Sequence, residues 1–223
     1  MTFLNPVFII SILIALSVHE AAHALAAYWL GDSTAKSEGR LTLNPIAHID
    51  LLGALLFVTV GFGWGKPVPV DPRNFRHPKR DNALTALAGP VSNLLLAFLC
   101  FLALVLVGNP ETSSAALLET PSVSQASMKF LLQLLESSLF LNLGLMAFNL
   151  LPIAPLDGSK IVEPFVPLRY EDQFSMFMQR GPYILLGLLL AERLLNFPFL
   201  SMWIEWLMDG VLGAFMLIVG VFV

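Results

Sequence analysis

Charged residues are scarce in this chain. Only 13% of its 223 residues are Asp, Glu, Lys or Arg, and 57% are hydrophobic, whereas a soluble domain carries about 25% charged residues. This deficit excludes a soluble globular protein and indicates several membrane-spanning helices. We therefore predict an all-α polytopic membrane protein with a single integral membrane domain over residues 1–223.

Other missing features exclude further classes of protein. No basic patch with interleaved aromatic residues occurs, so nucleic acid is not an expected partner. The single cysteine, Cys100, lies inside an apolar run and cannot form an intrachain disulfide. The first apolar segment follows no positively charged region and itself contains His and Glu, so we do not expect a cleaved signal peptide.

Five apolar segments are candidates for transmembrane helices. A spanning helix needs about 20 predominantly apolar residues, and the segments that approach or exceed this length are Pro6–Leu30, Asn82–Val107, Lys129–Leu151, Gly181–Phe197 and Pro198–Val223. A sixth segment, Ile49–Trp64, is shorter and ends in a glycine-rich sequence. We expect it to be re-entrant, and a spanning helix, a re-entrant helix and a hairpin all stay open as alternatives.

The distribution of positive charge predicts the orientation of the chain. Ten of the 12 Lys and Arg residues lie in the loops 31–48, 66–81 and 158–181, and the positive-inside rule places such loops in the cytoplasm. The loop 109–127 carries acidic residues and no Lys or Arg, so it falls outside. Within the first loop, the alternating pattern of Gly39–Pro45 predicts a short strand.

The first apolar segment contains the sequence His19-Glu20-Ala21-Ala22-His23. Histidines four residues apart share one face of a helix and can reach one metal ion. Glu20 is not placed to join them as a ligand and is the expected general base, which takes a proton from water. Because ionisable groups in a membrane segment are costly and usually functional, a metal site is favoured over a polar contact between helices.

A third ligand is expected from the segment Asn149–Gly158. Two prolines interrupt the helix there, and irregular backbone at membrane depth is tolerated only where it lines protein or a water-filled cavity. Asp157 is the candidate, although an Asp-Gly turn is an alternative and compatible role. With His19 and His23 it would form a catalytic site for one zinc ion per chain, leaving one position for water.

Three other polar residues are candidates for the site. Asn93 and Asn149 can donate hydrogen bonds to a substrate backbone or a developing oxyanion, and the alternative for each is a hydrogen bond between helices. His48 is a candidate for supporting or gating the site, whereas a lone histidine beside Asn-Pro more often caps a turn. The predicted orientation places His19, Asn93 and Asp157 toward the cytoplasmic ends of their helices, at a similar depth.

These motifs resemble those of the site-2 protease family of intramembrane zinc metalloproteases, over residues 7–165. The sequence His19 to His23 matches the family's H-E-x-x-H, Gly89 to Asn93 is similar to its G-P-x-x-N, and Asn149 to Gly158 is similar to its N-x-x-P-x-x-x-L-D-G. The resemblance implies a three-helix catalytic core, and the apolar helices expected from hydropathy over residues 181–223 follow it. It also implies zinc held by His19, His23 and Asp157, with Glu20 as the general base.

The resemblance further predicts the setting of the protein. Leu43–Asp50 and Gly65–Val70 look like the small prokaryotic branch of the family, so we expect an integral protein of the inner cell membrane whose site faces the cytoplasmic side. Its substrates would be membrane-spanning segments of other proteins within the lipid bilayer. The PDZ and CBS domains of some family members do not fit this sequence.

Two classes of function are compatible with these features. The first is a zinc endopeptidase that hydrolyses a peptide bond in or near a transmembrane segment, with cleavage of soluble peptides at the membrane surface as a variant. The second is a non-catalytic membrane scaffold or carrier for metal. A carrier needs a polar path on both sides of its site, and a degenerate scaffold would usually have lost Glu20 or a ligand. The intact set therefore predicts the enzyme.

Overall fold

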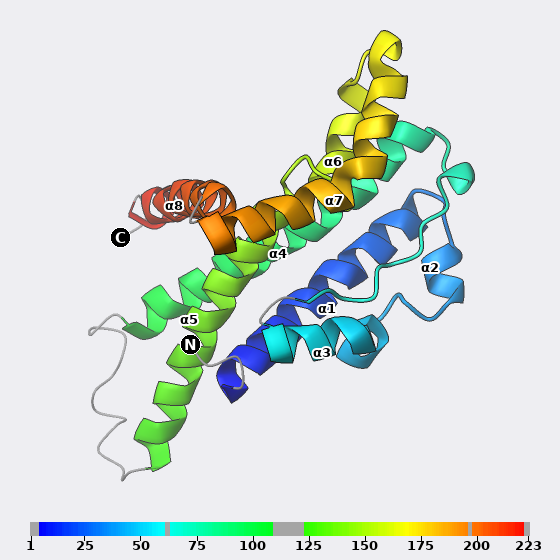
Figure 1. Ribbon diagram of the computed structural model, residues 1–223. Helices are drawn as coiled ribbons and strands as arrows, with labels where there is room; N and C mark the ends of the chain where they lie inside the picture. The colour runs from blue at the N-terminus through cyan, green and yellow to red at the C-terminus, as the bar shows by residue number, and fades with distance from the viewer. Residues whose placement is uncertain (1–4, 61–62, 109–122, 196–197, 221–223) are drawn as a thin grey trace.

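The structure is a computed structural model that describes residues 5–60, 63–108, 123–195 and 198–220 (Figure 1). Its α-helices are α1 (Pro6–Trp29), α2 (Thr34–Ser37), α3 (Leu51–Val60), α4 (Pro78–Gly108), α5 (Val123–Asn149), α6 (Asp157–Val162), α7 (Glu171–Leu195) and α8 (Phe199–Gly220). Short 3-10 helices are η1 (Pro45–His48), η2 (Pro72–Asn74), η4 (Glu163–Phe165) and η5 (Leu168–Tyr170). Helices α1, α4, α5, α7 and α8 are long and apolar enough to cross a membrane, which confirms the predicted all-α polytopic class.

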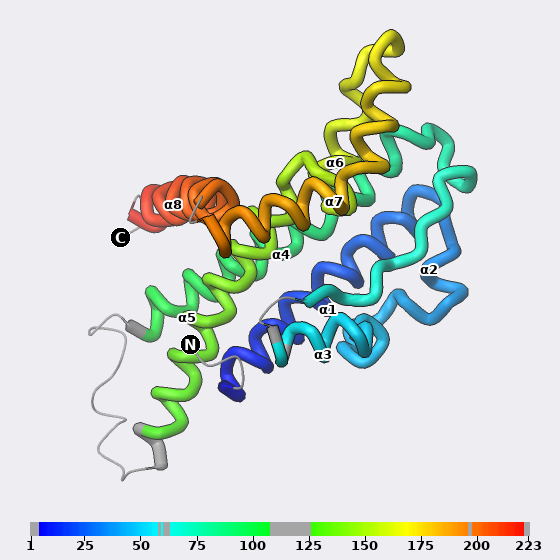
Figure 2. Tube along the Cα trace, in the orientation of Figure 1, coloured from blue at the N-terminus to red at the C-terminus, as the bar shows by residue number. Residues whose placement is uncertain are grey.

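Helices α1, α4 and α5 pack against one another and form the core of the protein. The buried face of α1 is built mainly from small residues, including Ser11, Ala15, Ala24 and Ala27. Small side chains let membrane helices approach closely, and this contact stabilises them where no hydrophobic effect can act. Figure 2 shows α8 on one side of this bundle and α3 on the other. Phe215 of α8 is buried in the cluster that α4 and α5 share.

The segment between η1 and the loop after α3 contains a helix too short to span a membrane, and its two ends lie together. Helix α3 has ten residues, which at about 1.5 Å per residue is half of the roughly 30 Å hydrocarbon core. An antiparallel bridge joins Ile49 to Gly65 and so brings the two ends of the segment together. The rings of Phe8 and Phe57 stack at 5.9 Å between centroids and attach α3 to α1.

The predicted strand at Gly39–Pro45 is wrong, because the described residues form no strand there. Their polar groups instead make local bonds: the Asn44 side chain accepts from the Ile46 amide, and the Thr42 hydroxyl accepts from the Asn44 amide. These contacts start η1 and leave no ladder for a second strand. Asn followed by proline favours such a turn, and this preference outweighs the alternating pattern.

Helix α7 begins at Glu171, ten residues before the apolar segment that starts at Gly181. Its charged first turns extend the helix beyond the apolar run, and acidic residues at a helix N-terminus are favoured by the helix dipole. At the other end, Glu192 accepts hydrogen bonds from the backbone amides of Leu200 and Ser201 and from the Ser201 hydroxyl. Glu192 therefore caps α8.

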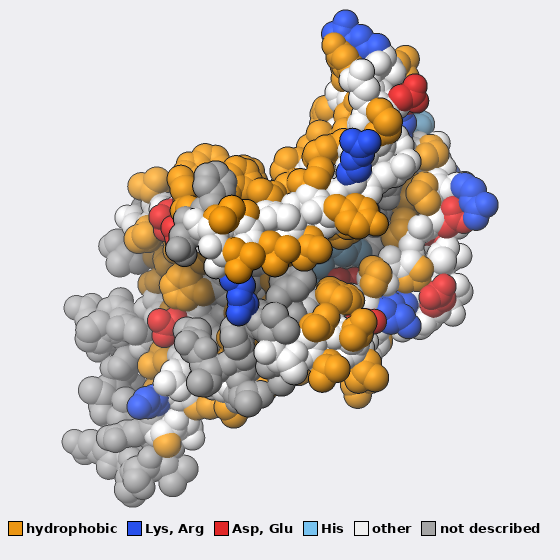
Figure 3. Space-filling view, viewed as in Figure 1, with side chains coloured by type: hydrophobic (Ala, Val, Ile, Leu, Met, Phe, Trp, Pro, Cys, Tyr) orange, Lys and Arg blue, Asp and Glu red, His pale blue; other side chains and the backbone are white. Residues whose placement is uncertain are grey.

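Basic side chains gather at one end of the molecule. Figure 3 shows Lys and Arg where α7 begins and beside α2, while hydrophobic side chains cover much of the face formed by α7 and α8. Large apolar residues on these two helices are exposed, among them Tyr183, Leu194, Trp206 and Leu217. A surface of this kind is stable against lipid and not against water.

Candidate metal centre

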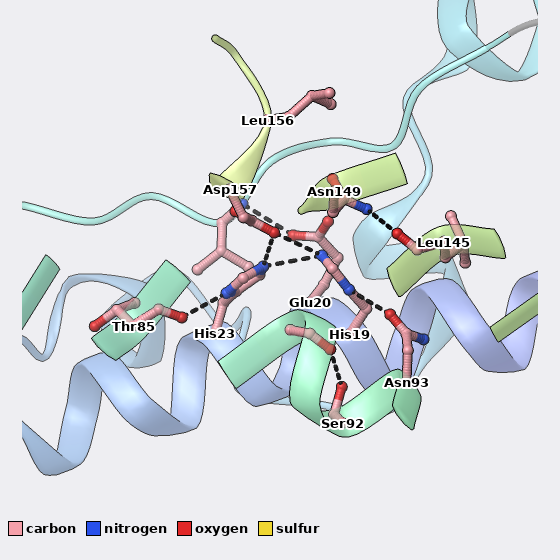
Figure 4. A network of polar contacts seen from close by, with 12 residues as sticks. His19, Glu20, His23, Thr85, Ser92, Asn93, Leu145, Asn149, Leu156 and Asp157 are labelled. Atoms are coloured by element: carbon pink, nitrogen blue, oxygen red, sulfur yellow. Dashed lines mark hydrogen bonds and ion pairs between the residues drawn. The ribbon is translucent and has the colours of Figure 1, made fainter. Parts of the chain in front are cut away.

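His19, His23 and Asp157 meet in the interior of the bundle (Figure 4). The Nε2 atoms of the two histidines are 3.0 Å apart, and Asp157 Oδ2 lies 3.2 Å from His19 Nε2 and 3.1 Å from His23 Nε2. All three residues are buried. The histidines are one helical turn apart on α1, whereas Asp157 is the first residue of α6.

The His23 imidazole has a defined tautomer. Its Nδ1 atom is 2.7 Å from the backbone carbonyl of Thr85 on α4. Because a carbonyl oxygen can only accept, Nδ1 carries a proton and donates it, and in the neutral ring the lone pair is then on Nε2, which faces Asp157. His19 Nδ1 is likewise held, at 2.6 Å from the side-chain oxygen of Asn93.

The three facing atoms fit a metal ion. Two Nε2 atoms and a carboxylate oxygen face one another at 3.0–3.2 Å, and in the neutral imidazoles with Nδ1 protonated both Nε2 atoms carry lone pairs. Asp157 Oδ2 is buried and accepts no hydrogen bond from the described residues, and its near neighbours are the two Nε2 atoms, which carry no proton in the neutral tautomers. An orphaned carboxylate oxygen is costly unless it is paired or coordinates a cation. Two imidazoles and one carboxylate are a donor set that zinc uses with three protein ligands.

Gly89 makes room for the two imidazoles. A Cβ atom at this position would lie 2.6 Å from His19 Cε1 and would also collide with the ring of His23. The next residue, Pro90, is buried inside α4 and cannot donate to the carbonyl one turn earlier. The Gly-Pro pair therefore brings the backbone of α4 close to the two rings.

Asp157 does not lie in an Asp-Gly turn but at the start of α6. The chain between α5 and α6 is irregular and largely buried. Gly158 packs under the carbonyls of Leu150 and Leu151, where a Cβ atom would overlap both oxygens. The glycine thus allows α6 to fold back against the end of α5, and this close approach carries Asp157 to the histidines.

Glu20 lies next to the triad with one carboxylate oxygen already bonded. Its Oε2 accepts from the Val68 backbone amide at 3.2 Å. Proline precedes and follows Val68, so this amide is the single backbone donor of the three residues. The extended segment after α3 therefore holds the carboxylate that is the expected base.

The segment that carries Val68 is fixed by a buried arginine. Arg40 donates to the carbonyls of Lys66 at 2.6 Å and Pro67 at 3.1 Å, and its exposed fraction is 3%. His48, which is also fully buried, lies 3.4 Å from Arg40 through Nδ1 and 2.8 Å from the Thr42 carbonyl through Nε2. His48 thus lies beside Arg40, which holds the segment whose Val68 amide bonds to Glu20.

A second support is at Asp32, just beyond the end of α1. Its buried carboxylate accepts from the Asp71 amide at 2.8 Å and from the Asn74 side chain at 2.8 Å, and it caps Thr34. Burial raises the pKa of Asp32, but the hydrogen bonds from Thr34, Asn74 and the Asp71 amide outweigh burial and hold the pKa below its ordinary value. The loop before α4 is thereby tied to α1.

The two asparagines that the sequence singles out are placed differently. Asn93 is fully buried, and both ends of its amide contact protein groups: Oδ1 faces His19, and Nδ2 donates to Ala15 and to Asn142. Asn149 is half-buried near the triad and uses one N–H to bond the Leu145 carbonyl of its own helix, at 3.0 Å (Figure 4). No hydrogen bond from its other N–H is formed with the described residues.

Sequence reasoning missed Asn142, which is fully buried and bonds to Asn93. The signal was present, because Asn142 precedes Asn149 by seven residues, which is two turns of α5. It therefore shares a face of this helix with a residue that the sequence had singled out. A polar residue in the middle of an apolar segment is the feature that marks it.

Comparison with known proteins agrees with this geometry. The model of peptidase family M50 matches residues 7–189. The chain is 44% identical over 164 residues to "Putative zinc metalloprotease YwhC" of Bacillus subtilis, covering 74% of this chain and 71% of the relative. It is 32% identical over 202 residues to "Putative zinc metalloprotease Rip2" of Mycobacterium tuberculosis, covering 88% and 71%. No solved structure gives a significant match.

Proposed function

Because the chain belongs to peptidase family M50 and is a membrane metalloprotease, we propose that it hydrolyses a peptide bond in or near a transmembrane segment of another membrane protein. One zinc ion per chain would be held by His19, His23 and Asp157. The observation that carries the proposal is the buried triangle of three donor atoms beside the carboxylate of Glu20, inside a helix that can span the membrane.

The proposed chemistry divides between the ion and the chain. Zinc, when bound, supplies Lewis-acid chemistry: it polarises a carbonyl group and makes water more acidic. Glu20 accepts the proton of the attacking water and returns it to the leaving amine. The Val68 amide supports this role, because it fixes the carboxylate in one orientation.

Asn149 is the better candidate of the two asparagines for contact with substrate. Its remaining N–H can donate to the carbonyl oxygen of the scissile bond or of a neighbouring peptide. Asn93 has its amide committed to helix and histidine contacts. We therefore assign Asn149 to the substrate and Asn93 to the orientation of His19.

The substrate class follows from where the site lies. His19 and His23 belong to a spanning helix, and the surrounding helices expose apolar side chains. A segment that reaches this site must be compatible with lipid, which favours the transmembrane part of a protein over a soluble peptide. The clustered Lys and Arg residues support a site near the cytoplasmic face of a bacterial inner membrane.

Replacing Glu20 by Gln tests the catalytic role. We expect the variant to bind zinc as the parent does and to lose cleavage by at least about 10²-fold, since general base catalysis contributes that much or more. Asp157→Ala is the complementary variant and should lose zinc as well as activity. A Glu20→Gln protein that cleaves at the parental rate would refute this mechanism, and a well-folded parent without zinc would favour the scaffold or carrier.

The substrate class needs a separate measurement. A single-span protein and its soluble portion, both containing the same cleavage sequence, are incubated with the purified chain in lipid vesicles. We expect cleavage of the membrane-embedded form alone. Equal cleavage of the two forms would show that the protease acts on soluble peptides at the membrane surface.

A further inference from the structure

A line of buried amides connects the metal centre to the interior of the bundle. Asn93 on α4 and Asn142 on α5 are both fully buried, and Asn93 contacts the His19 ring through Nδ1. Asn93 Nδ2 donates to Asn142 Oδ1 at 2.7 Å and to the Ala15 carbonyl at 3.2 Å. Asn142 Nδ2 donates to the Ser138 carbonyl at 2.7 Å. Buried amides in a membrane protein need such partners.

The orientation of Asn142 is fixed by the backbone. The Ser138 carbonyl can only accept a hydrogen bond, so the NH₂ group of Asn142 must face it. The side-chain oxygen of Asn142 then faces Asn93. A reversed amide would place an oxygen against the Ser138 carbonyl and an NH₂ group against that of Asn93.

The orientation of Asn93 follows from that of Asn142. Two acceptors, Asn142 Oδ1 and the Ala15 carbonyl, both require the NH₂ group of Asn93. Its side-chain oxygen is therefore left facing His19 Nδ1 at 2.6 Å. An oxygen at this position demands a proton on Nδ1, so in the neutral ring, the form that can bind a metal, the lone pair is on Nε2, which faces Asp157.

The two histidines are thus oriented by different kinds of hydrogen-bond partner. His23 bonds directly to the Thr85 carbonyl, and a backbone oxygen cannot turn over. His19 depends on an asparagine, whose amide could rotate and offer a donor instead. Two acceptors oppose a reversal of the Asn93 amide: the Ala15 carbonyl at 3.2 Å and, at the shorter distance of 2.7 Å, Asn142 Oδ1.

We propose that Asn142 is a positioning residue of the metal centre, which together with the Ala15 carbonyl holds the Asn93 amide and through it the tautomer and ring direction of His19. Partners that orient a ligating histidine commonly change metal affinity by 10–100-fold when removed. The inference rests on the zinc site proposed above. It goes beyond that site, because the side chain of Asn142 bonds to Asn93 and to the Ser138 carbonyl and is not one of the three proposed zinc ligands.

The test compares the zinc affinity of Asn142→Ala with that of the parent, in the full chain in detergent. Affinity is measured by competition with a chromophoric chelator, and the absorption spectrum of Co²⁺ in the same site reports ligand geometry. We expect about tenfold weaker zinc binding and an altered Co²⁺ spectrum. Unchanged affinity and spectrum would overturn the proposal.

Ser138→Ala is the matched control. It removes the hydrogen bond of 3.1 Å between the hydroxyls of Ser138 and Ser11, which also joins buried residues of α5 and α1. The carbonyl that holds Asn142 remains. If Asn142 serves only to hold helices together, the two variants should lose zinc equally, and that result refutes positioning.

Asn142→Asp is the conservative variant. A neutral carboxyl group has the shape of the amide, accepts from Asn93, and can donate its O–H to the Ser138 carbonyl. A buried carboxyl group favours this neutral form. We expect zinc affinity close to that of the parent, and a loss as large as in Asn142→Ala would contradict the relay. A parent that binds no zinc would instead overturn the proposed function.

Discussion

Replacing Gly89 by Ala is the most direct way to test how α4 approaches the metal centre. The added Cβ would lie 2.6 Å from His19 Cε1 and closer still to His23, far inside van der Waals contact. Neither ring can retreat freely, because each Nδ1 atom is hydrogen bonded to α4. The substitution must therefore push the rings out of their positions or push the two helices apart.

The expected size of the effect comes from the cost of overpacking. Extra methyl groups in a well-packed interior cost about 1–3 kcal/mol. If the ligand positions carry this strain, zinc affinity falls by about 5- to 150-fold, at 1.4 kcal/mol for each factor of ten. The measurement is zinc competition with a chelator, accompanied by the rate of cleavage at saturating zinc.

Gly144→Ala in α5 is the control for this experiment. A Cβ atom at position 144 meets no atom of the described residues within 4 Å beyond its own stretch of helix, and alanine is favoured over glycine inside a helix by about 0.5–1 kcal/mol. We expect parental zinc affinity and unchanged or slightly higher stability. Parental affinity in the Gly89 variant as well would refute the close approach of α4 to the histidines.

Three further substitutions test the supports around the site. Val68→Pro removes the amide bonded to the proposed base and should lower cleavage about tenfold or more, the worth of a hydrogen bond to a charged group; zinc content should not change, and Val68→Ala should cleave normally. Arg40→Met should destabilise the protein by about 1–3 kcal/mol in thermal unfolding, because two buried carbonyls lose their donor, whereas exposed Arg73→Met should leave the melting temperature unchanged. The lowered pKa of Asp32 stabilises the fold above the ordinary carboxyl pKa, and this stabilisation is lost as pH falls through the folded-state pKa. Melting temperature should thus fall less steeply with acid in Asp32→Asn, and an unaltered pH dependence would contradict this contribution.

The grouping of the candidate ligands could be predicted from the sequence because its constraints are local or chemical. His19 and His23 share a helix face by spacing alone, and a buried charge in an apolar run is usually functional. Asp157 was reached by similar reasoning, from prolines that interrupt a helix at membrane depth. The alternative of an Asp-Gly turn could not be settled without knowing that Gly158 packs against the carbonyls of Leu150 and Leu151, just after α5.

Helix ends were predicted less accurately than helix positions. The apolar pattern places α7 at Gly181, but hydrogen bonding continues back to Glu171 through charged turns. Hydropathy indicates which residues can lie in the hydrocarbon core, and a helix can continue beyond those residues into water. The role of Glu192 was missed for another reason: its partners are backbone amides of α8, which carry no sequence signal.

The antiparallel packing of α1 and α4 agrees with the spacing of the residues through which they meet. Thr85, Gly89 and Asn93 are four residues apart on α4, so they lie along one face, and they contact two histidines that are four residues apart on α1. Asn93 pairs with the earlier histidine and Thr85 with the later one, which requires antiparallel helices. Gly89 then falls midway, where the two rings come closest to α4. The Gly-Pro-Val-Ser-Asn motif is therefore the structural complement of His-Glu-Ala-Ala-His: glycine admits the rings, and asparagine one turn later orients one of them.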